Sequence, residues 1–196
     1  MTQVVLFHSA FGVRPGIEDA AERLRGAGHG VLIVDQYDGR VFDAYDEADA
    51  HVQSIGFPEL MRRAVTGVEA LADGFVAAGF SNGGGMAEYV ATQRRVSGVL
   101  MLAGALPVEI LGADAWPAGV PAQIHYTAGD PRRRQEWVDA VAASVRAADA
   151  ALEVFDYAGD GHLFTDPSLP GEYQPDEAAL LWERVLAFAP LAGGAP

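Results

Sequence analysis

The fold is decided by residues 75–83, which read FVAAGFSNG. The first four are apolar without a break, a pattern that favours a strand buried on both faces of a parallel sheet. A helical pattern begins at Asn82, directly after the turn, and ends near Arg94. The turn has the form G-x-S-x-G between a strand and a helix, which is typical of a nucleophile elbow. This stretch predicts an α/β protein in which Ser81 stands exposed above the sheet.

Apolar runs and amphipathic stretches alternate along the rest of the chain. Six runs predict strands: Gln3–Phe7, Val31–Val34, Gly74–Gly79, Gly98–Leu102, Ala122–Tyr126 and Ala151–Tyr157. Five stretches predict helices: Pro15–Ala27, Pro58–Leu71, Asn82–Arg94, Arg132–Ala148 and Pro175–Phe188. A β-α-β-α series of this kind implies right-handed crossovers. We predict a doubly wound, mostly parallel sheet of about six strands that is flanked by helices.

The length of the chain fits one domain. It has 196 residues, and domains average ~150 residues, so we expect a single α/β domain over residues 1–190. Residues 36–57 join a strand to a helix but exceed the usual connection of about 2–6 residues. We interpret this acidic segment either as a lid or substrate loop, or as a solvated loop. The tail, residues 191–196, is expected to be disordered.

Charge and composition exclude several classes of protein. The formal net charge is −14, which disfavours nucleic acid as a partner because phosphate neutralisation needs clustered basic side chains. There are no cysteines, so disulfides, thiolate metal sites and a cysteine nucleophile are excluded. No window approaches ~18 consecutive apolar residues, and the first residues lack the features of a signal peptide. We expect a cytoplasmic protein without a membrane partner.

The elbow places stabilising groups beside the hydroxyl of Ser81. The N-terminus of the following helix offers free N–H groups and a partial positive charge. The backbone N–H of Asn82 is therefore a candidate donor to an oxyanion. In this arrangement a second donor comes from the loop after the first strand, here residues 8–12, HSAFG. Our candidate for that second donor is the N–H of Ala10.

A serine nucleophile needs a general base, and only two histidines follow Ser81 in the chain. His125 lies inside the apolar run 122–126 and is interpreted as a packed strand residue. His162 lies in a glycine-containing loop just after the last apolar run, and loops at the carboxyl ends of strands carry the chemistry of this fold. We predict His162 as the base, with His125 as the alternative.

The base in turn needs an acid to orient it. Four aspartates are candidates: Asp130, Asp156, Asp160 and Asp166. Asp130 lies in a turn just after an apolar run and gives the order serine, acid, histidine that α/β-hydrolases show. Asp160 is only two residues from His162, which disfavours a contact with its ring. We predict Asp130 as the acid; its alternative role is the N-cap of the helix that begins near Arg132.

Taken together, these residues resemble the dienelactone hydrolase family of α/β-hydrolases over nearly the whole chain. The resemblance is carried by SAFG at 9–12, DQYDG at 35–39, GFSNGG at 79–84, HYTAGDP at 125–131, YAGDGHLF at 157–164 and AALLWERVLAF at 178–188. It implies the α/β-hydrolase fold and a catalytic triad of Ser81, Asp130 and His162. It also implies oxyanion donors at Ala10 and Asn82.

The chain departs from the family's name-giving enzymes at three places. Ser81 stands where those enzymes use a cysteine, and Ser9 stands where they carry a glutamate. Residues 163–166, LFTD, lack the arginine that follows the histidine there and holds a substrate carboxylate. We therefore expect a short, serine-nucleophile member that does not act on dienelactone itself.

The predicted function is that of a serine hydrolase that cleaves a small carboxylic ester or lactone through an acyl-enzyme. No metal and no organic cofactor is expected, and the negative net charge favours a neutral substrate. Residues beside the expected catalytic loops are candidates for the substrate pocket: Ser9, Phe11, Phe80, Tyr126 and Phe164. Three alternatives stay open: a thioesterase or acyltransferase on the same scaffold, a non-catalytic binding module, and a metal site made by Asp43, Asp46 and Asp49.

Overall fold

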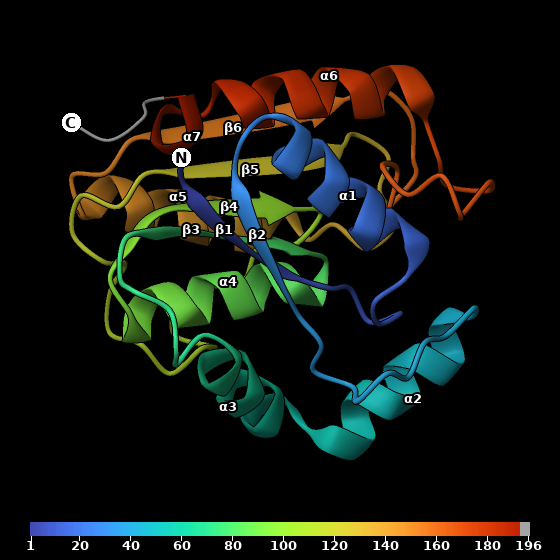
Figure 1. The fold of residues 1–196 in the computed structure, drawn as a ribbon, viewed down its shortest axis with the longest axis horizontal. Coiled ribbons are helices and arrows are strands. Elements are labelled where there is room, and N and C mark those ends of the chain that lie inside the picture. The colour runs from blue at the N-terminus through green and yellow to red at the C-terminus, as the bar shows by residue number, and fades with distance from the viewer. Residues whose placement is uncertain (193–196) are drawn as a thin grey trace.

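A single sheet of six parallel strands forms the centre of the protein, as the computed structural model, which describes residues 1–192, shows (Figure 1). The strands are β1 (Gln3–Phe7), β2 (Gly30–Val34), β3 (Phe75–Phe80), β4 (Val96–Leu102), β5 (Ala122–Thr127) and β6 (Leu152–Tyr157). Their order is β2-β1-β3-β4-β5-β6, and every neighbouring pair is parallel. The strand order changes direction between β1 and β3, and in open α/β sheets ligands bind at such a switch point.

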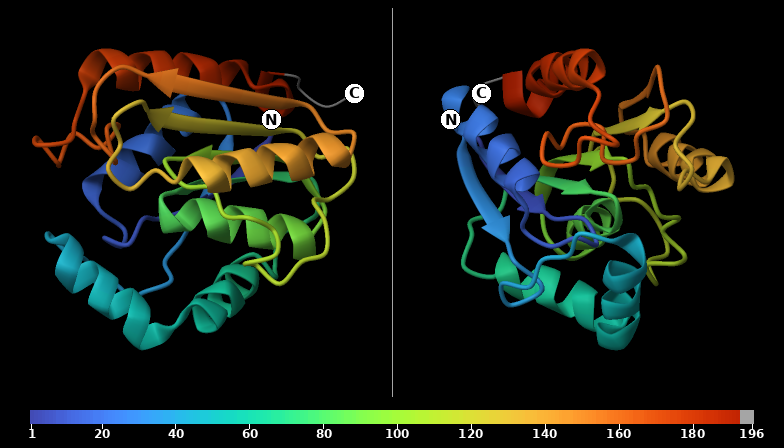
Figure 2. Two further views of the ribbon diagram at one scale, coloured as in Figure 1. Left: turned by 180° about the vertical axis from the view of Figure 1, so that it is seen from behind. Right: turned by 90° about the vertical axis from the view of Figure 1, so that its right-hand side faces the viewer.

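Helices cover both faces of the sheet (Figure 2). The helices are α1 (Pro15–Gly26), α2 (Tyr45–Ile55), α3 (Phe57–Gly67), α4 (Asn82–Gln93), α5 (Gln135–Ala147), α6 (Pro175–Ala187) and α7 (Ala189–Ala192). The side chains of α1 and α6 join one apolar cluster, and those of α3, α4 and α5 join the other. The doubly wound architecture that the sequence predicted is thus confirmed.

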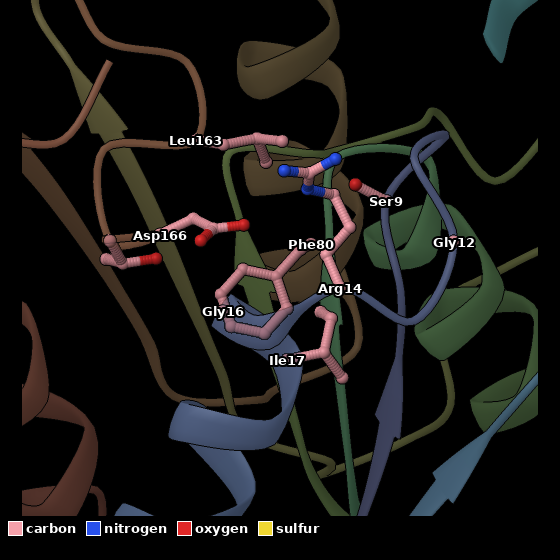
Figure 3. Close-up of a pocket in the computed structure, with 9 residues that line it drawn as sticks. Ser9, Gly12, Arg14, Gly16, Ile17, Phe80, Leu163 and Asp166 are labelled. Carbon is pink, nitrogen blue, oxygen red and sulfur yellow. The ribbon is translucent and has the colours of Figure 1, made fainter. Parts of the chain in front are cut away.

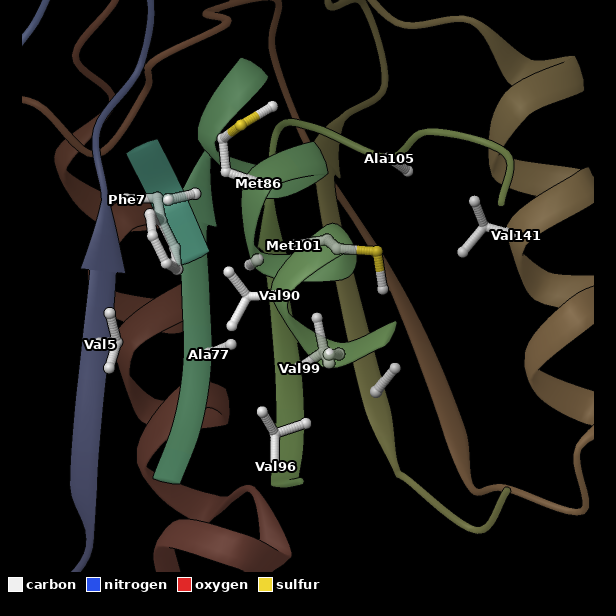
Figure 4. Packing of buried hydrophobic residues seen from close by; sticks show 14 of the residues in the cluster. Val5, Phe7, Ala77, Met86, Val90, Val96, Val99, Met101, Ala105 and Val141 are labelled. Atoms are coloured by element: carbon white, nitrogen blue, oxygen red, sulfur yellow. The ribbon is translucent and has the colours of Figure 1, made fainter. Parts of the chain in front are cut away.

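Each inner strand contributes alternate side chains to the two apolar clusters. In β1, Val5 and Phe7 pack with the α3–α4–α5 side, whereas Val4 and Leu6 pack with the α1–α6 side. All four are fully buried, which explains why the strand reads as a continuous apolar run. Figure 4 shows Val5 and Phe7 on the first of these sides. Burial of each such side chain contributes about 1.5–3 kcal/mol.

The segment 36–57 is not the loop that its length and charge suggested, because residues 45–55 form α2. Three of its apolar side chains, Tyr45, Ala48 and Val52, follow helical spacing and pack against the rest of the protein. Acidic residues occupy the first turn, where the helix dipole stabilises negative charge. Gly56, with φ +83°, ends α2 and allows α3 to start at once in a new direction. The helical spacing was present in the sequence but was masked by the acidic residues.

The expectation of a disordered tail from residue 191 was wrong at its first positions. Residues 189–192 form α7, and the side chain of Leu191 is buried in the α1–α6 cluster. An apolar side chain that finds a core contact of this kind holds the chain end in place. The rest of the tail, residues 193–196, lies outside the described residues. Within residues 1–192, no helix combines the length and the apolar character needed to cross a membrane.

A carboxyl group is buried between α4 and the segment that follows β4. Glu88 of α4 is fully buried, and one of its carboxyl oxygens accepts the backbone N–H of Leu106 at 2.9 Å. Burial raises the pKa of the Glu88 carboxyl well above its usual range. The native protein thus retains a proton that the unfolded chain releases.

This retained proton makes stability depend on pH. Between about pH 5 and pH 8 the unfolded state binds fewer protons than the native state at this group, so its contribution lowers the free energy of unfolding as pH rises. We expect Glu88→Gln to remove that decline while its amide oxygen still accepts the Leu106 N–H. Urea denaturation at pH 5 and pH 8 measures the effect. Glu136→Gln on the exposed side of α5 is the control, and an equal pH slope in both variants would contradict the expectation.

Candidate active site

Three polar side chains from separate strand ends meet at the carboxyl edge of the sheet. Ser81 follows β3, Asp130 follows β5 and His162 follows β6. The Nε2 atom of His162 lies 2.8 Å from the Oγ of Ser81. Its Nδ1 atom lies 2.7 Å from Oδ2 of Asp130. The structure thus brings together the three residues that the sequence singled out, in one continuous hydrogen-bonded series.

The backbone at Ser81 adopts a conformation that residues other than glycine rarely adopt. Its φ is +55° and its ψ is −120°, a combination that costs about 1–3 kcal/mol. The turn is possible because glycines, which lack a Cβ, occupy the points where neighbouring backbone segments approach one another most closely. A Cβ on Gly79 would overlap the carbonyl oxygen of Gly83, and a Cβ on Gly104 would overlap the carbonyl oxygen of Ser81. Gly79 and Gly83 of the G-x-S-x-G sequence thus allow close packing, and within that sequence the positive φ falls on Ser81.

The surroundings of His162 fix its ring orientation. The side chain of Asp130 is fully buried and that of His162 is nearly so. A carboxylate only accepts hydrogen bonds, so Nδ1 of His162 donates and Nε2 is left to accept the Ser81 hydroxyl. The other oxygen of Asp130 accepts the backbone N–H of Arg132 at 2.7 Å. Asp130 thus makes a turn contact besides the orienting contact, but it is not the helix N-cap of its alternative interpretation, because α5 begins at Gln135 and Arg134 is its N-cap.

The alternative base and acids lie elsewhere. The ring of His125 is buried between the Tyr157 hydroxyl and the Gln123 side chain, at 2.8 and 3.1 Å. Burial lowers the pKa of His125 to about 3, so this ring stays neutral. Asp160 is exposed. The remaining candidates bind other partners: Asp156 pairs with Arg133, and Asp166 accepts hydrogen bonds from Ser168.

The two residues predicted to supply oxyanion donors lie beside the same cavity as Ser81. Ala10 follows β1, Asn82 begins α4, and both line the same cavity as Ser81 and His162. Within residues 1–192, neither amide N–H donates a hydrogen bond to the protein. The loop before Ala10 is held by Ser9, whose hydroxyl accepts the N–H of Phe11 at 3.2 Å. Two free N–H groups thus remain available to an oxygen atom bound near Ser81.

The cavity above Ser81 has a volume of about 250 Å³. Apolar groups dominate its wall and come from α2, α3, β5, α5 and the segment after β4. These lining residues are Val52, Phe57, Ala103, Ala105, Leu106, Tyr126 and Trp137. One aspartate, Asp49 of α2, and one arginine, Arg132, complete the wall. An apolar cavity with a few polar groups is what a small organic ligand needs.

The substrate pocket expected from the sequence overlaps this cavity at one residue only. Tyr126 lines it, but Ser9 and Phe80 face a separate void of about 10 Å³ beside Arg14 (Figure 3). The side chains of Phe11 and Phe164 are buried in the α1–α6 cluster. These four residues adjoin the site in sequence, but three of them point into the core, as large aromatics near strand ends commonly do.

Sequence reasoning missed most of the cavity wall. Val52 and Phe57 lie in the segment 36–57, which was interpreted either as a lid or substrate loop or as a solvated loop, without a role for single residues. Leu106 and Arg132 come from connections whose path the sequence did not reveal. Trp137 belongs to α5, a helix that the sequence predicted without assigning this residue to the site. The helical spacing of α2 is a signal in the sequence that would have located Val52.

Side-chain contacts hold α2 over the site. The hydroxyl of Tyr45 donates to Glu172 at 2.8 Å, and Asp49 pairs with Arg132 at 3.0 Å. Two of the three aspartates that suggested a metal site thus bind arginines, since Asp43 pairs with Arg14 as Asp49 does with Arg132. Among residues 1–192, no three potential metal ligands gather at one point.

Comparisons with known proteins agree with this architecture. No curated protein sequence matches the chain, but several solved structures do. A protein designated m3DLH is 25% identical with a TM-score of 0.77, over 95% of this chain and 84% of that chain. A dienelactone hydrolase-like promiscuous phosphotriesterase from metagenomic libraries is 24% identical with a TM-score of 0.80, over the same shares.

A third solved structure is more distant. A thermophilic esterase from Thermogutta terrifontis, with propionate bound, is 16% identical with a TM-score of 0.70, over 99% of this chain and 86% of that chain. These likenesses show the α/β-hydrolase fold. The model of the dienelactone hydrolase family matches residues 1–190. Because that match covers nearly the entire sequence, the chain belongs to the dienelactone hydrolase family of ester-cleaving α/β-hydrolases.

Proposed function

We propose that the protein is a serine hydrolase that cleaves small, uncharged carboxylic esters or lactones through an acyl-enzyme. The observation that carries the proposal is the hydrogen-bonded series from Ser81 through His162 to Asp130, with contacts of 2.8 and 2.7 Å. Nucleophile, base and orienting acid in this geometry are the constellation that acyl transfer requires.

The first half of the reaction forms the acyl-enzyme. Oγ of Ser81 attacks the ester carbonyl while Nε2 of His162 takes the hydroxyl proton. The carbonyl oxygen gains negative charge, which the N–H groups of Ala10 and Asn82 stabilise; one such donor contributes on the order of 3 kcal/mol. His162 then gives its proton to the leaving alkoxide as the carbon–oxygen bond breaks.

The second half releases the acid. Water gives a proton to Nε2 of His162 and attacks the acyl carbon, and the proton returns to Oγ of Ser81 as the acyl–serine bond breaks. Through both halves the carboxylate of Asp130 holds Nδ1–H and stabilises the imidazolium. These steps use only side chains and backbone amides of the chain.

The wall of the cavity supports the proposed substrate class. Its surface is mainly apolar, and its volume of about 250 Å³ suits a small molecule. The net charge of −14 opposes the approach of anions. The propionate bound to the Thermogutta terrifontis esterase is the carboxylate that hydrolysis of a propionyl ester releases, and it supports short acyl esters as the first substrates to test here.

Asp130→Asn tests the orienting role. An amide can present its NH₂ group to His162 and favour the wrong tautomer, so we expect kcat for p-nitrophenyl acetate to fall by about a thousandfold or more. The control is Asp160→Asn, which makes the same change at an exposed position two residues from His162. The proposal fails if both variants retain wild-type rates while remaining folded by circular dichroism.

A further inference from the structure

One charged pair interrupts the apolar wall of the cavity above Ser81. Asp49 of α2 and Arg132, just before α5, both line the cavity. Two guanidinium nitrogens of Arg132 meet the two carboxylate oxygens of Asp49, at 3.0 and 3.4 Å. About a third of the arginine side chain and two fifths of the aspartate side chain remain exposed. The carboxylate therefore sits on the guanidinium as a bidentate partner next to the reaction site.

A second contact fixes the guanidinium in place independently of Asp49. Its central carbon lies 3.8 Å from the centre of the Tyr45 ring, and arginine stacks readily on aromatic faces. Tyr45 is in turn held by its hydrogen bond to Glu172. The backbone N–H of Arg132 also donates to Asp130. If the carboxylate of Asp49 were removed, the charged head would stay beside the cavity.

Among the described residues that line the cavity, Asp49 is the only carboxylate and Arg132 is the only guanidinium. With Asp49 present, its charge cancels that of Arg132, and a carboxylate entering the cavity finds the guanidinium already occupied. It also meets the negative charge of Asp49 itself. An uncharged group of the same shape meets neither obstacle.

We infer that Asp49 determines specificity by occupying the guanidinium of Arg132, so that the cavity accepts uncharged esters and rejects carboxylate-bearing ones. This inference rests on the proposed function for its kinetic consequence, because it names the substrate class of the same site. Its binding consequence is independent of any turnover. Loss of the Asp49 charge converts a neutral wall into an anion subsite centred on Arg132.

Isothermal titration calorimetry measures the binding consequence directly. The probes are 3-hydroxybenzoate and 3-hydroxybenzamide, which have the same shape and differ in charge. We expect Asp49→Asn to tighten the benzoate by on the order of tenfold, the size expected for a charge-assisted contact, with no gain for the benzamide. The double variant Asp49→Asn/Arg132→Gln is expected to lose this gain.

The matched control is Asp46→Asn, which removes the same charge from an exposed position of α2 and is expected to leave both affinities unchanged. Equal gains in Asp46→Asn and Asp49→Asn would overturn the inference, because the effect would then come from net charge. No gain in Asp49→Asn would also overturn it, provided that thermal melting shows the variant to be folded. A gain that survives Arg132→Gln would do the same.

Kinetics with 3-acetoxybenzoate and 3-acetoxybenzamide separate this inference from the proposed function. If both stand, Asp49→Asn raises kcat/KM for the benzoate relative to the benzamide by on the order of tenfold. If the calorimetric gain appears while no variant hydrolyses either ester, the subsite stands and the proposed function fails. A further outcome is that the wild type hydrolyses the benzamide ester while Asp49→Asn changes neither the benzoate-to-benzamide ratio of affinities nor that of kcat/KM. In that case the proposed function stands and the role of Asp49 fails.

Discussion

Replacing Ser81 with alanine is expected to lower kcat/KM for p-nitrophenyl acetate by at least about a thousandfold. Among the described residues, the Ser81 hydroxyl is the only hydrogen-bond partner of Nε2 of His162, at 2.8 Å. Without it, the base can at best activate water for direct attack. The residual rate would then come from substrate binding and from the amides of Ala10 and Asn82.

The matched control is Ser97→Ala. Ser97 belongs to β4 but lies near its start, at the opposite end of the sheet from the cavity. The kcat/KM of Ser97→Ala should therefore equal that of the wild type, while that of Ser81→Ala shows the whole expected loss. The circular dichroism of both variants should stay like that of the wild type. A Ser81→Ala variant that retains more than about a tenth of the wild-type kcat/KM would contradict the assignment of the nucleophile.

Gly79→Ala is expected to have the largest effect on stability. Its new methyl group would overlap the carbonyl oxygen of Gly83 and the backbone nitrogen of Gly84. These are backbone atoms at the start of α4, and they cannot move without displacing the helix from the sheet. We expect the free energy of unfolding to fall by about 4 kcal/mol or more, at the upper end of single substitutions.

Urea denaturation measures this loss, and Gly26→Ala is the control. Apart from its chain neighbours and the backbone of its own helix, no atom of the described residues lies within 4 Å of the position that a Cβ on Gly26 would occupy. Alanine favours helices over glycine by about 1 kcal/mol. That variant should be as stable as the wild type or slightly more so. If Gly79→Ala unfolds at the same urea concentration as Gly26→Ala, the close approach of β3 and α4 is not a real constraint.

The strands and most helices were predictable because their sequence patterns are local consequences of burial. A strand such as β3 is covered on both faces, so every residue of it is apolar. The helix α2 was missed because its apolar face consists of few residues between acidic ones. The tail was misjudged because burial of Leu191 depends on a contact with the distant core.

The hydrogen-bonded series was predictable for a different reason. Parallel strands all end at the same edge of the sheet, so Ser81, Asp130 and His162 are brought near one another by topology alone. Topology does not place the residues of the cavity wall in the same way, because their positions depend on how α2 and the connection before α5 fold over the carboxyl edge of the sheet. The pairing of Asp49 with Arg132 joins residues that are 83 positions apart, and no local sequence pattern predicts it.

Covalent labelling with a fluorophosphonate, followed by mass spectrometry of the digested protein, tests directly whether Ser81 is the nucleophile. We expect one phosphonyl group per chain on the peptide that contains Ser81, because Nε2 of His162 activates that hydroxyl. Labelling should disappear in His162→Ala. A label on another residue, or no label on folded wild-type protein, would contradict the assignment of Ser81 as the nucleophile.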